Sequence, residues 1–241
     1  MKIPKRLRRN PIIDAVAEVR FTSSLPSEAI LGIVYEKVKD KFGKPVTLPI
    51  LQLPSALREK DPNLKYQACY RFTKPGNVLL VGPYNIALST NPYTDWDAAT
   101  PMLSDLLSQF DQINLFQSVQ RIGLRYVNFF EKLNIFEHLT LSLAVNNESI
   151  AKQSIVLRTE AEVEGFKVIT NVSNAAETSV SGLGKTGSIL DLDIIHESPN
   201  IGGEPIPKAL LRLFAHANRL ADNAFFALMK EEFLAEFEPQ Y

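Results

Sequence analysis

The sequence predicts an α+β fold: a mainly antiparallel sheet, two shorter helices in the N-terminal half and one long C-terminal helix. Three observations support this prediction. Segments with an apolar residue at every second position alternate with segments whose apolar residues recur every three or four positions. Most strand-like segments are joined by short turns, which favours antiparallel pairing. The last helical segment, from about 207 to 236, is long enough to cross a sheet diagonally.

The N-terminal half opens with a strand-like segment and a helical segment, continues with further strand-like segments, and ends with a second helical segment. Strands are expected at 11–22, 66–72 and 78–90, an extended segment at 46–53, and helices at 24–42 and 94–112. The first helix follows Ser24 and Pro26 and ends before Gly43 and Pro45, which are residues typical of helix ends. The polar segment 55–65 is expected to be a loop.

The C-terminal half again opens with strands and closes with a helix. Strands are expected at 117–130, 139–146, 152–163, 166–174 and 188–196, and loops at 179–187 and 199–207. The long helix has an apolar stripe made of Leu210, Phe214, Ala217, Ala221, Ala224 and Leu228. Burial of this stripe on the sheet is favoured over its exposure to a partner, because helices gain most of their stability from tertiary packing.

The domain organisation follows from this order and from charge. We expect a basic N-terminal arm, residues 1–10, followed by a single α+β domain, 11–241. A division of this domain into two similar halves, 11–114 and 115–241, is an alternative, because the internal identity is too weak to count as a repeat. The arm contains five basic residues and no acid: Lys2, Lys5, Arg6, Arg8 and Arg9. The rest of the chain is net acidic, which excludes a basic nucleic-acid-binding surface over the whole protein. Nucleic-acid binding through the arm alone remains an alternative.

Other bulk features favour a cytoplasmic protein without a cofactor. The single cysteine, Cys69, excludes an internal disulfide framework and a cysteine-rich zinc site. No apolar run approaches the length of a membrane span, so we expect no membrane association. The basic start lacks the apolar core of a signal peptide, because Pro11 and Asp14 interrupt the segment that follows.

Two strand-like segments carry charge on one face, where a half-buried strand is usually apolar. They are Arg121-Ile122-Gly123-Leu124-Arg125-Tyr126-Val127-Asn128 and Leu190-Asp191-Leu192-Asp193. Because side chains alternate along a strand, Arg121, Gly123 and Arg125 share one face, and Asp191 and Asp193 share another. Aspartate and glycine are both uncommon in strands, so their presence requires a reason.

Two interpretations of these charges stay open. In one, Asp191 and Asp193, continued by Glu197, hold a divalent cation while Arg121 and Arg125 bind an anion over the notch at Gly123. In the other, the arginines and aspartates lie on neighbouring strands and pair with each other. The second is favoured, and adjacency of segments 121–128 and 189–195 would decide between them.

Other sequence features fit chemical motifs poorly, and no catalytic residue is assigned. Gly182 to Gly187 resembles a phosphate-binding loop, but it lacks the first glycine and is followed by a strand instead of a helix. His138, His196 and His216 do not have the spacing of a helical zinc site. No nucleophile motif is present.

Two segments resemble the marks of a sporadically distributed, uncharacterised bacterial family of similar length. They are Asn10-Pro11-Ile12-Ile13-Asp14-Ala15-Val16 near the start and the arginine-bearing segment 121–128 in the middle. The resemblance spans nearly the whole chain and implies no reaction and no catalytic residues. The patchy distribution of the family implies an accessory gene that travels with mobile elements or defence functions.

The leading functional hypothesis is a non-enzymatic cytoplasmic accessory protein that engages a protein partner, or a second copy of itself, through the long helix and the sheet surface. It rests on the absence of a complete catalytic constellation beside a long amphipathic helix. The first alternative is a metal-dependent enzyme that acts on a phosphate-containing substrate with Asp191, Asp193, Arg121 and Arg125. The second is nucleic-acid binding through the basic arm.

Overall fold

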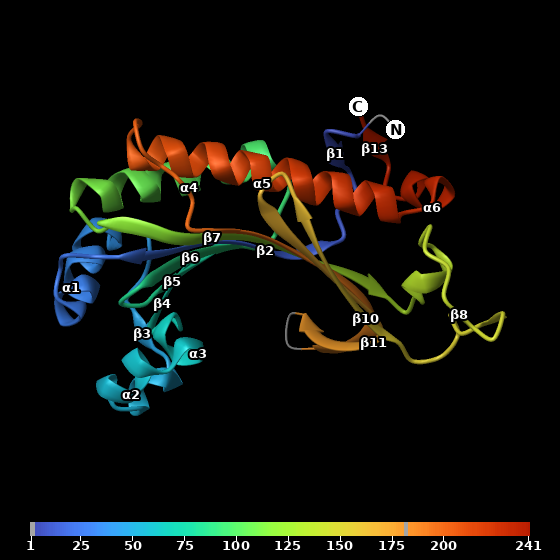
Figure 1. The fold of residues 1–241 in the computed structure, drawn as a ribbon, viewed down its shortest axis with the longest axis horizontal. Helices are drawn as coiled ribbons and strands as arrows, with labels where there is room; N and C mark the ends of the chain where they lie inside the picture. Colours follow the sequence, from blue (N-terminus) through green and yellow to red (C-terminus); the bar gives the residue numbers. More distant parts are fainter. Residues whose placement is uncertain (1–2, 181–182) are drawn as a thin grey trace.

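A nine-stranded antiparallel sheet forms the centre of the molecule (Figure 1). The structure is a computed structural model and describes residues 3–180 and 183–241. The strands are arranged in the order β10-β11-β12-β7-β2-β6-β5-β4-β3. Their bounds are β2 Ile12–Thr22, β3 Val46–Thr47, β4 Tyr70–Lys74, β5 Asn77–Val81, β6 Asn85–Thr90, β7 Ser118–Glu131, β10 Val156–Val163, β11 Phe166–Val180 and β12 Leu183–Glu197. The predicted α+β fold class is confirmed.

The two halves of the chain meet at the central pair of strands, β2 and β7. From this pair, the first half continues outward through β6, β5 and β4, and the second half through β12, β11 and β10. In each half the strand next to the central one is the last of a three-strand meander, so both halves have the same strand order.

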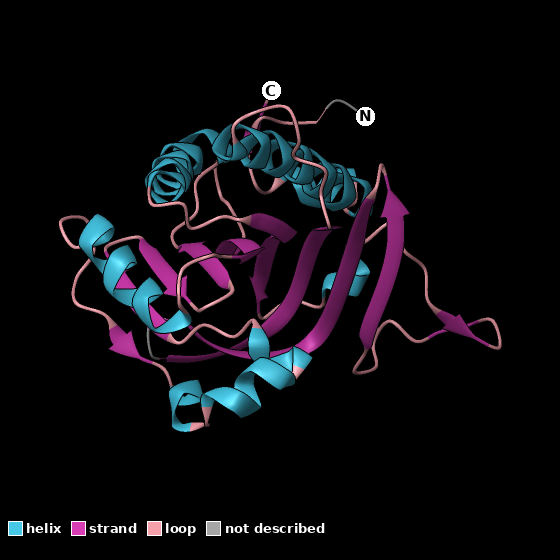
Figure 2. Cartoon of the chain, turned by 60° about the vertical axis from the view of Figure 1, so that its left-hand side comes forward, coloured by secondary structure: helices cyan, strands magenta, loops and turns pink. Residues whose placement is uncertain are grey.

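One face of the sheet is covered by α4, Trp96–Gln112, and α5, Ile206–Leu228. Figure 2 shows the long helix extending across this face. The buried residues of α5 follow the predicted stripe: Ala209, Leu210, Leu213, Phe214, Ala217, Leu220, Ala221, Phe225 and Phe226. The shorter helix α1, Ser27–Val38, contacts α4 and adds Ile30, Val34 and Val38 to the same hydrophobic core. The apolar stripe of α5 is thus buried against the sheet.

The end of α5 differs from the prediction. The helix stops at Leu228 instead of continuing to 236, because Met229 is extended and pairs with Leu139. A short helix, α6, Glu231–Ala235, follows. It packs Phe233 and Leu234 into a second hydrophobic cluster, which also contains Phe130, Leu190 and Phe225. None of the helices that the structure describes is long and apolar enough to cross a membrane.

The two ends of the chain lie side by side (Figure 1). Strand β1, Arg6–Leu7, pairs with β13, Pro239–Gln240, and Leu7 enters the second hydrophobic cluster. Arg8 and Arg9 both form ion pairs with Glu238, at 3.1 and 3.0 Å. The basic arm is therefore attached to the C-terminus from residue 5 onward.

Several loop and strand predictions are corrected by the structure. The expected loop 55–65 contains α2, Ser55–Lys60, and α3, Pro62–Lys65, and the extended segment 46–53 contains the 3₁₀ helix Pro49–Gln52. Pro49 and Pro62 stand at the first position of the 3₁₀ helix and of α3, and the Asp61 side chain accepts from the N–H of Asn63 at 2.8 Å, which favours helix starts at these places. The expected strand 139–146 is broken up: Leu139 forms an isolated bridge with Met229, and β8, Ala144–Val145, pairs with β9, Glu148–Ser149. A second 3₁₀ helix, Ile135–Glu137, precedes these residues.

The expected loop at 179–187 is also corrected. β11 continues to Val180 and β12 begins at Leu183, because the two strands keep pairing beyond an irregularity between Ser173 and Ala176. Gly182, the start of the loop that resembles a phosphate-binding motif, lies outside the described residues. The rest of that loop, from Leu183, is strand.

Candidate functional site

The face of the sheet opposite α4 and α5 carries the charges that the sequence predicted. We call this set the charged face; it consists of Glu18, Arg20, Arg121, Arg125, Asp191, Asp193 and Glu197. β7 and β12 are neighbours, with Arg125 opposite Asp193 and Arg121 opposite Glu197. β2 lies on the other side of β7, with Arg20 opposite Arg121 and Glu18 opposite Gly123. The arginine-bearing strand and the aspartate-bearing strand are thus neighbours in the sheet.

Arg125 and Asp191 form a two-pronged ion pair. The Nε and Nη2 atoms of Arg125 donate to the two carboxylate oxygens of Asp191, at 2.7 and 2.9 Å. Asn171 on β11 donates to the same carboxylate at 3.3 Å. The hydrogen bond to Asp191 raises the pKa of Arg125. Both oxygens of Asp191 are therefore occupied by protein donors.

Arg121 is the most enclosed arginine of this face, with 11% of its side chain exposed. Its guanidinium donates to Glu18 at 3.2 Å and lies 3.5 Å from Glu197 and 4.0 Å from Asp193. A Cβ atom placed on Gly123 would have the Arg121 guanidinium as its nearest neighbour, at 3.7 Å. The notch expected at Gly123 is therefore filled by Arg121, and is not left open for a ligand.

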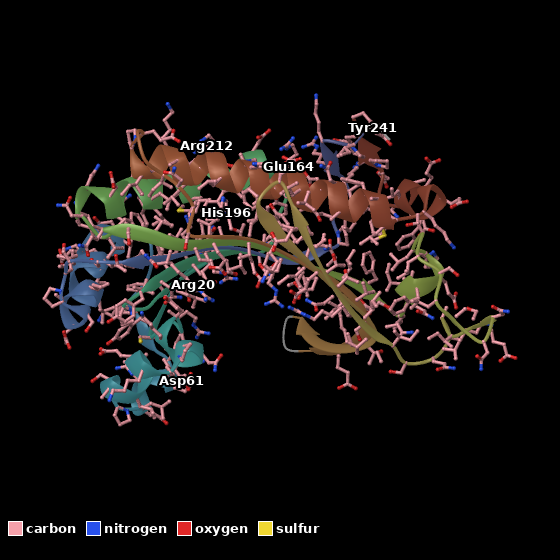
Figure 3. All side chains as sticks on the ribbon, viewed as in Figure 1. Arg20, Asp61, Glu164, His196, Arg212 and Tyr241 are labelled. Atoms are coloured by element: carbon pink, nitrogen blue, oxygen red, sulfur yellow. The ribbon has the colours of Figure 1, made fainter. Side chains whose placement is uncertain are left out.

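The ion pairs extend sideways into a network that crosses the sheet. Glu18 also accepts from Arg20 at 2.6 Å, and Arg20 lies over the ring of Tyr66, 4.7 Å from its centre. On the other side, Asn171 accepts from Arg158 on β10 at 3.0 Å. Figure 3 shows Arg20 on the side of the sheet opposite α5.

The chemistry of the charged face favours a structural role. Three arginines stand against four carboxylates, so the face has no excess of positive charge for a phosphate group. Burial raises the pKa of Asp193, and Arg121 and Arg125 act against that shift. Among the described residues, no group of three or more His, Cys, Asp or Glu side chains could hold a metal ion. The predicted metal candidates Asp191, Asp193 and Glu197 are instead brought together with arginines.

The other predicted residues are not gathered into one site. Lys2 lies outside the described residues, and Lys5, Arg6, Arg8 and Arg9 lie along β1 and the residues that flank it. His196 packs edge-on against Phe166, and His138 stacks on Phe233. His216 on α5 lies 2.7 Å from Glu164, which is in the turn between β10 and β11 (Figure 3).

A second candidate site lies on the opposite side of the sheet, between β7, α5, the start of α4 and the N-terminal arm. We call it the aromatic pocket. It has a volume of about 80 Å³ and opens to solvent on one side. Its aromatic walls are Tyr93, Trp96, Tyr126, Phe225 and Phe226. Its polar groups include Asn10, Asn128, Asn218, Asp95 and Asp222, with Lys5 and Arg6 from the arm. A concave, mainly apolar cavity with a few converging polar groups is typical of a ligand site.

A chain of hydrogen bonds connects four of these residues. Tyr93 and Tyr126 are joined through their hydroxyl groups at 3.1 Å, and Tyr126 donates to Oδ1 of Asn218 at 2.7 Å. The amide nitrogen of Asn218 then donates to Oδ2 of Asp222 at 3.1 Å. Burial raises the pKa of Tyr93 and Tyr126, so both phenols keep their protons and act as donors. This series of hydrogen bonds ends at the carboxylate of Asp222.

Asp222 is a carboxylate without a cationic partner among the described residues. Lys5 and Arg6 line the same pocket, yet neither forms an ion pair with Asp222; Arg6 donates instead to Gln240. Burial raises the pKa of Asp222 to about 6, and the hydrogen bond from Asn218 opposes this shift only in part. A half-buried carboxyl group with a shifted pKa beside a cavity is a feature of functional sites.

The aromatic pocket is not predicted by any local pattern of the sequence. Asn218 and Asp222 are four residues apart on α5, at the border of its apolar stripe, so both point to the same side of the helix. That spacing is a signal in the sequence. Their proximity to Tyr93 and to the arm is set by tertiary contacts between segments far apart in the chain, and no local pattern predicts it.

Comparison with known proteins adds no assignment. No protein-family model matches the chain, and no curated protein matches it. The resemblance of segments 10–16 and 121–128 to a bacterial family therefore stays a prediction. The function must be argued from the geometry.

Replacement of Arg121 by methionine, which keeps an apolar stem of similar length, tests the structural role of the charged face. Arg121→Met leaves Glu18 and Asp193 beside each other without their shared cation, so we expect the free energy of unfolding to fall by about 2–4 kcal/mol. Arg212→Met, which removes an exposed arginine paired with Glu204, should cost less than about 1 kcal/mol. Urea unfolding measures both, and equal losses would contradict a structural role for Arg121.

Replacement of Asp222 by asparagine should stabilise the protein near pH 7.5, by about 1–3 kcal/mol. The pKa of Asp222 in the folded protein, about 6, lies above its ordinary value of 3.8. The folded state thus binds the proton more tightly than the unfolded state, and ionisation destabilises the fold. The advantage of Asp222→Asn should shrink as the pH falls from 7 towards 4. Unfolding curves at both ends of that range test this, and a variant less stable than wild type at pH 7.5 would contradict it.

Proposed function

We propose that the protein is a non-enzymatic cytoplasmic binding protein that engages a protein partner through the edge strand β10, and that this partner is a second copy of the chain. The observation that carries the proposal is the exposure of β10. It ends the sheet, pairs only with β11 in the part of the chain that the structure describes, and has exposed residues on both faces. Val156 is 78% exposed.

The free edge of β10 presents a regular row of backbone groups. Val163 and Phe166 close a two-residue turn in which Glu164 and Gly165 both have positive φ, so this pair is hydrogen-bonded. Hydrogen-bonded and non-hydrogen-bonded pairs alternate along an antiparallel ladder. The N–H and C=O groups of residues 156, 158, 160 and 162 therefore point away from β11. An exposed row of this kind is a template for another strand.

The charges of β10 fit an antiparallel copy of itself. If Thr159 lies opposite Thr159 of the second copy, Arg158 of each chain faces Glu160 of the other, and all outward backbone groups are matched. A shift by two residues in either direction would place Arg158 opposite Arg158 or Glu160 opposite Glu160. Like charges directly opposite each other destabilise a strand pair. The charges thus favour one register and oppose its neighbours.

The two alternative functions have less support. A metal-dependent phosphate enzyme would need Asp191, whose two oxygens already accept from Arg125. Nucleic-acid binding through the arm would need Arg8 and Arg9, which share Glu238. A partner would not bind the apolar stripe of α5, as the sequence suggested, because that stripe is buried against the sheet.

Proline at position 160 should abolish self-association without unfolding the chain. The N–H of Glu160 points to the free edge, so Glu160→Pro removes a donor needed by a second strand and none used by β11. We expect the wild type to form a concentration-dependent dimer and Glu160→Pro to sediment as a monomer with an unchanged circular dichroism spectrum. Sedimentation velocity measures this.

A charge exchange provides the matched control. Arg158→Glu alone places like charges opposite each other and should weaken the dimer, whereas Arg158→Glu combined with Glu160→Arg restores opposite charges and should rescue it. A strictly monomeric wild type, or a double variant as weak as the single one, would reject β10 self-pairing.

A further inference from the structure

We propose that the aromatic pocket binds a small organic cation, an amine or amidine, whose N–H groups donate to the carboxylate of Asp222. This activity is separate from the self-association of β10, because none of the residues that line the pocket belongs to β10 or β11. The proposal rests on the shape of the pocket, the direction of its hydrogen bonds and the charges around Asp222.

The direction of the hydrogen bonds identifies the group that is left to bind a ligand. The hydroxyl of Tyr126 donates to Asn218, so its oxygen is left to accept from the hydroxyl of Tyr93. Asn218 in turn donates to Asp222, so all three donors of this series point toward the carboxylate. Asn218 reaches only Oδ2 of Asp222. Oδ1 therefore lacks a hydrogen-bond donor among the described side chains, and a carboxylate can accept several hydrogen bonds.

The charges that line the pocket balance, two basic residues against two carboxylates, so the preference for a cation rests on the position of Asp222. On the arm, Lys5 and Arg6 line the pocket, and Arg6 is held by Gln240 at β13. On the opposite wall, Asp95 caps α4 by accepting from the N–H of Ala98 at 2.8 Å. The carboxylate of Asp222 accepts from Asn218 through Oδ2 alone and has no cationic partner among the described residues. An anionic ligand near it would meet a second negative charge in a partly buried place, which is unfavourable.

The residue choice at 222 also supports a binding role. The position borders the buried stripe of α5, where an apolar or neutral residue would avoid the cost of a buried charge. A residue that lowers the stability of the free protein but suits a ligand is common at functional sites. Aromatic walls add attraction for an organic cation through their ring faces.

Trp96 makes the test direct, because it is the only tryptophan of the chain and it lines the pocket. Benzamidine is a suitable probe, since its planar amidinium can donate two hydrogen bonds to one carboxylate. We expect benzamidine to change Trp96 fluorescence in a saturable manner, with calorimetry giving the same dissociation constant. Neutral benzamide and anionic benzoate, which have the same ring, should bind at least tenfold more weakly.

Asp222→Asn should reduce the affinity for benzamidine about 10–100-fold, the effect of losing a hydrogen bond to a charged group. Asp97→Asn, an exposed position one residue after Trp96 and outside the pocket lining, is the matched control and should bind as the wild type does. Because Asp222 must be ionised, affinity should fall about tenfold between pH 8 and pH 5 in the wild type but not in Asp222→Asn.

Three results would overturn the proposal. They are an absence of saturable benzamidine binding, equal losses in Asp222→Asn and Asp97→Asn, or benzoate binding as tightly as benzamidine. Because Asn has the shape of Asp, and its amide oxygen can still accept from Asn218, loss of binding in Asp222→Asn is not expected to reflect unfolding. The unfolding midpoint of the variant checks this directly.

Discussion

The structure depends on one constraint: a nine-stranded sheet whose helical cover, α4 and α5, lies on a single face. On the opposite face, the charged side chains must find their partners among themselves. Its central strands, β2, β7 and β12, meet this requirement with ion pairs in which Arg121 and Arg125 each reach a carboxylate on a neighbouring strand. Partly buried charges are tolerated where partners and hydrogen bonds are supplied together, and the charged face supplies both. The same one-sided cover leaves β10 exposed at the edge.

The sequence predicted those parts of the fold that depend on local periodicity. Alternation of apolar residues located β2, β7 and β12, and the stripe of α5 identified its buried side correctly. It predicted the charged strands and favoured their mutual pairing, because opposite charges on strand faces have few other uses. It did not predict the continuation of β11 and β12 through 179–187, where glycines and polar residues resemble a loop but cross-strand pairing persists. Short helices at 55–65 were missed because they have no apolar stripe.

The aromatic pocket was missed for a different reason. Its residues come from five separate segments, and the arm becomes one of its walls only because β1 pairs with β13 at the other end of the chain. No window of sequence contains that contact. The carboxylates of the pocket and of the charged face also have different partners. Those of the charged face pair with arginines, whereas Asp222 accepts a hydrogen bond from a neutral amide, that of Asn218. This contrast separates a structural network from a site with unused binding capacity.

The central claim is that the arginines of the charged face are occupied by protein carboxylates and not open to a ligand. NMR of the arginine Nε–H groups tests it most directly, during addition of pyrophosphate with and without Mg²⁺. The account predicts that the signals of Arg121 and Arg125 are protected from solvent exchange and do not move, whereas exposed Arg212 shifts weakly and without saturation. A saturable shift of the Arg121 or Arg125 signal would contradict the account and return the charged face to the status of a binding site.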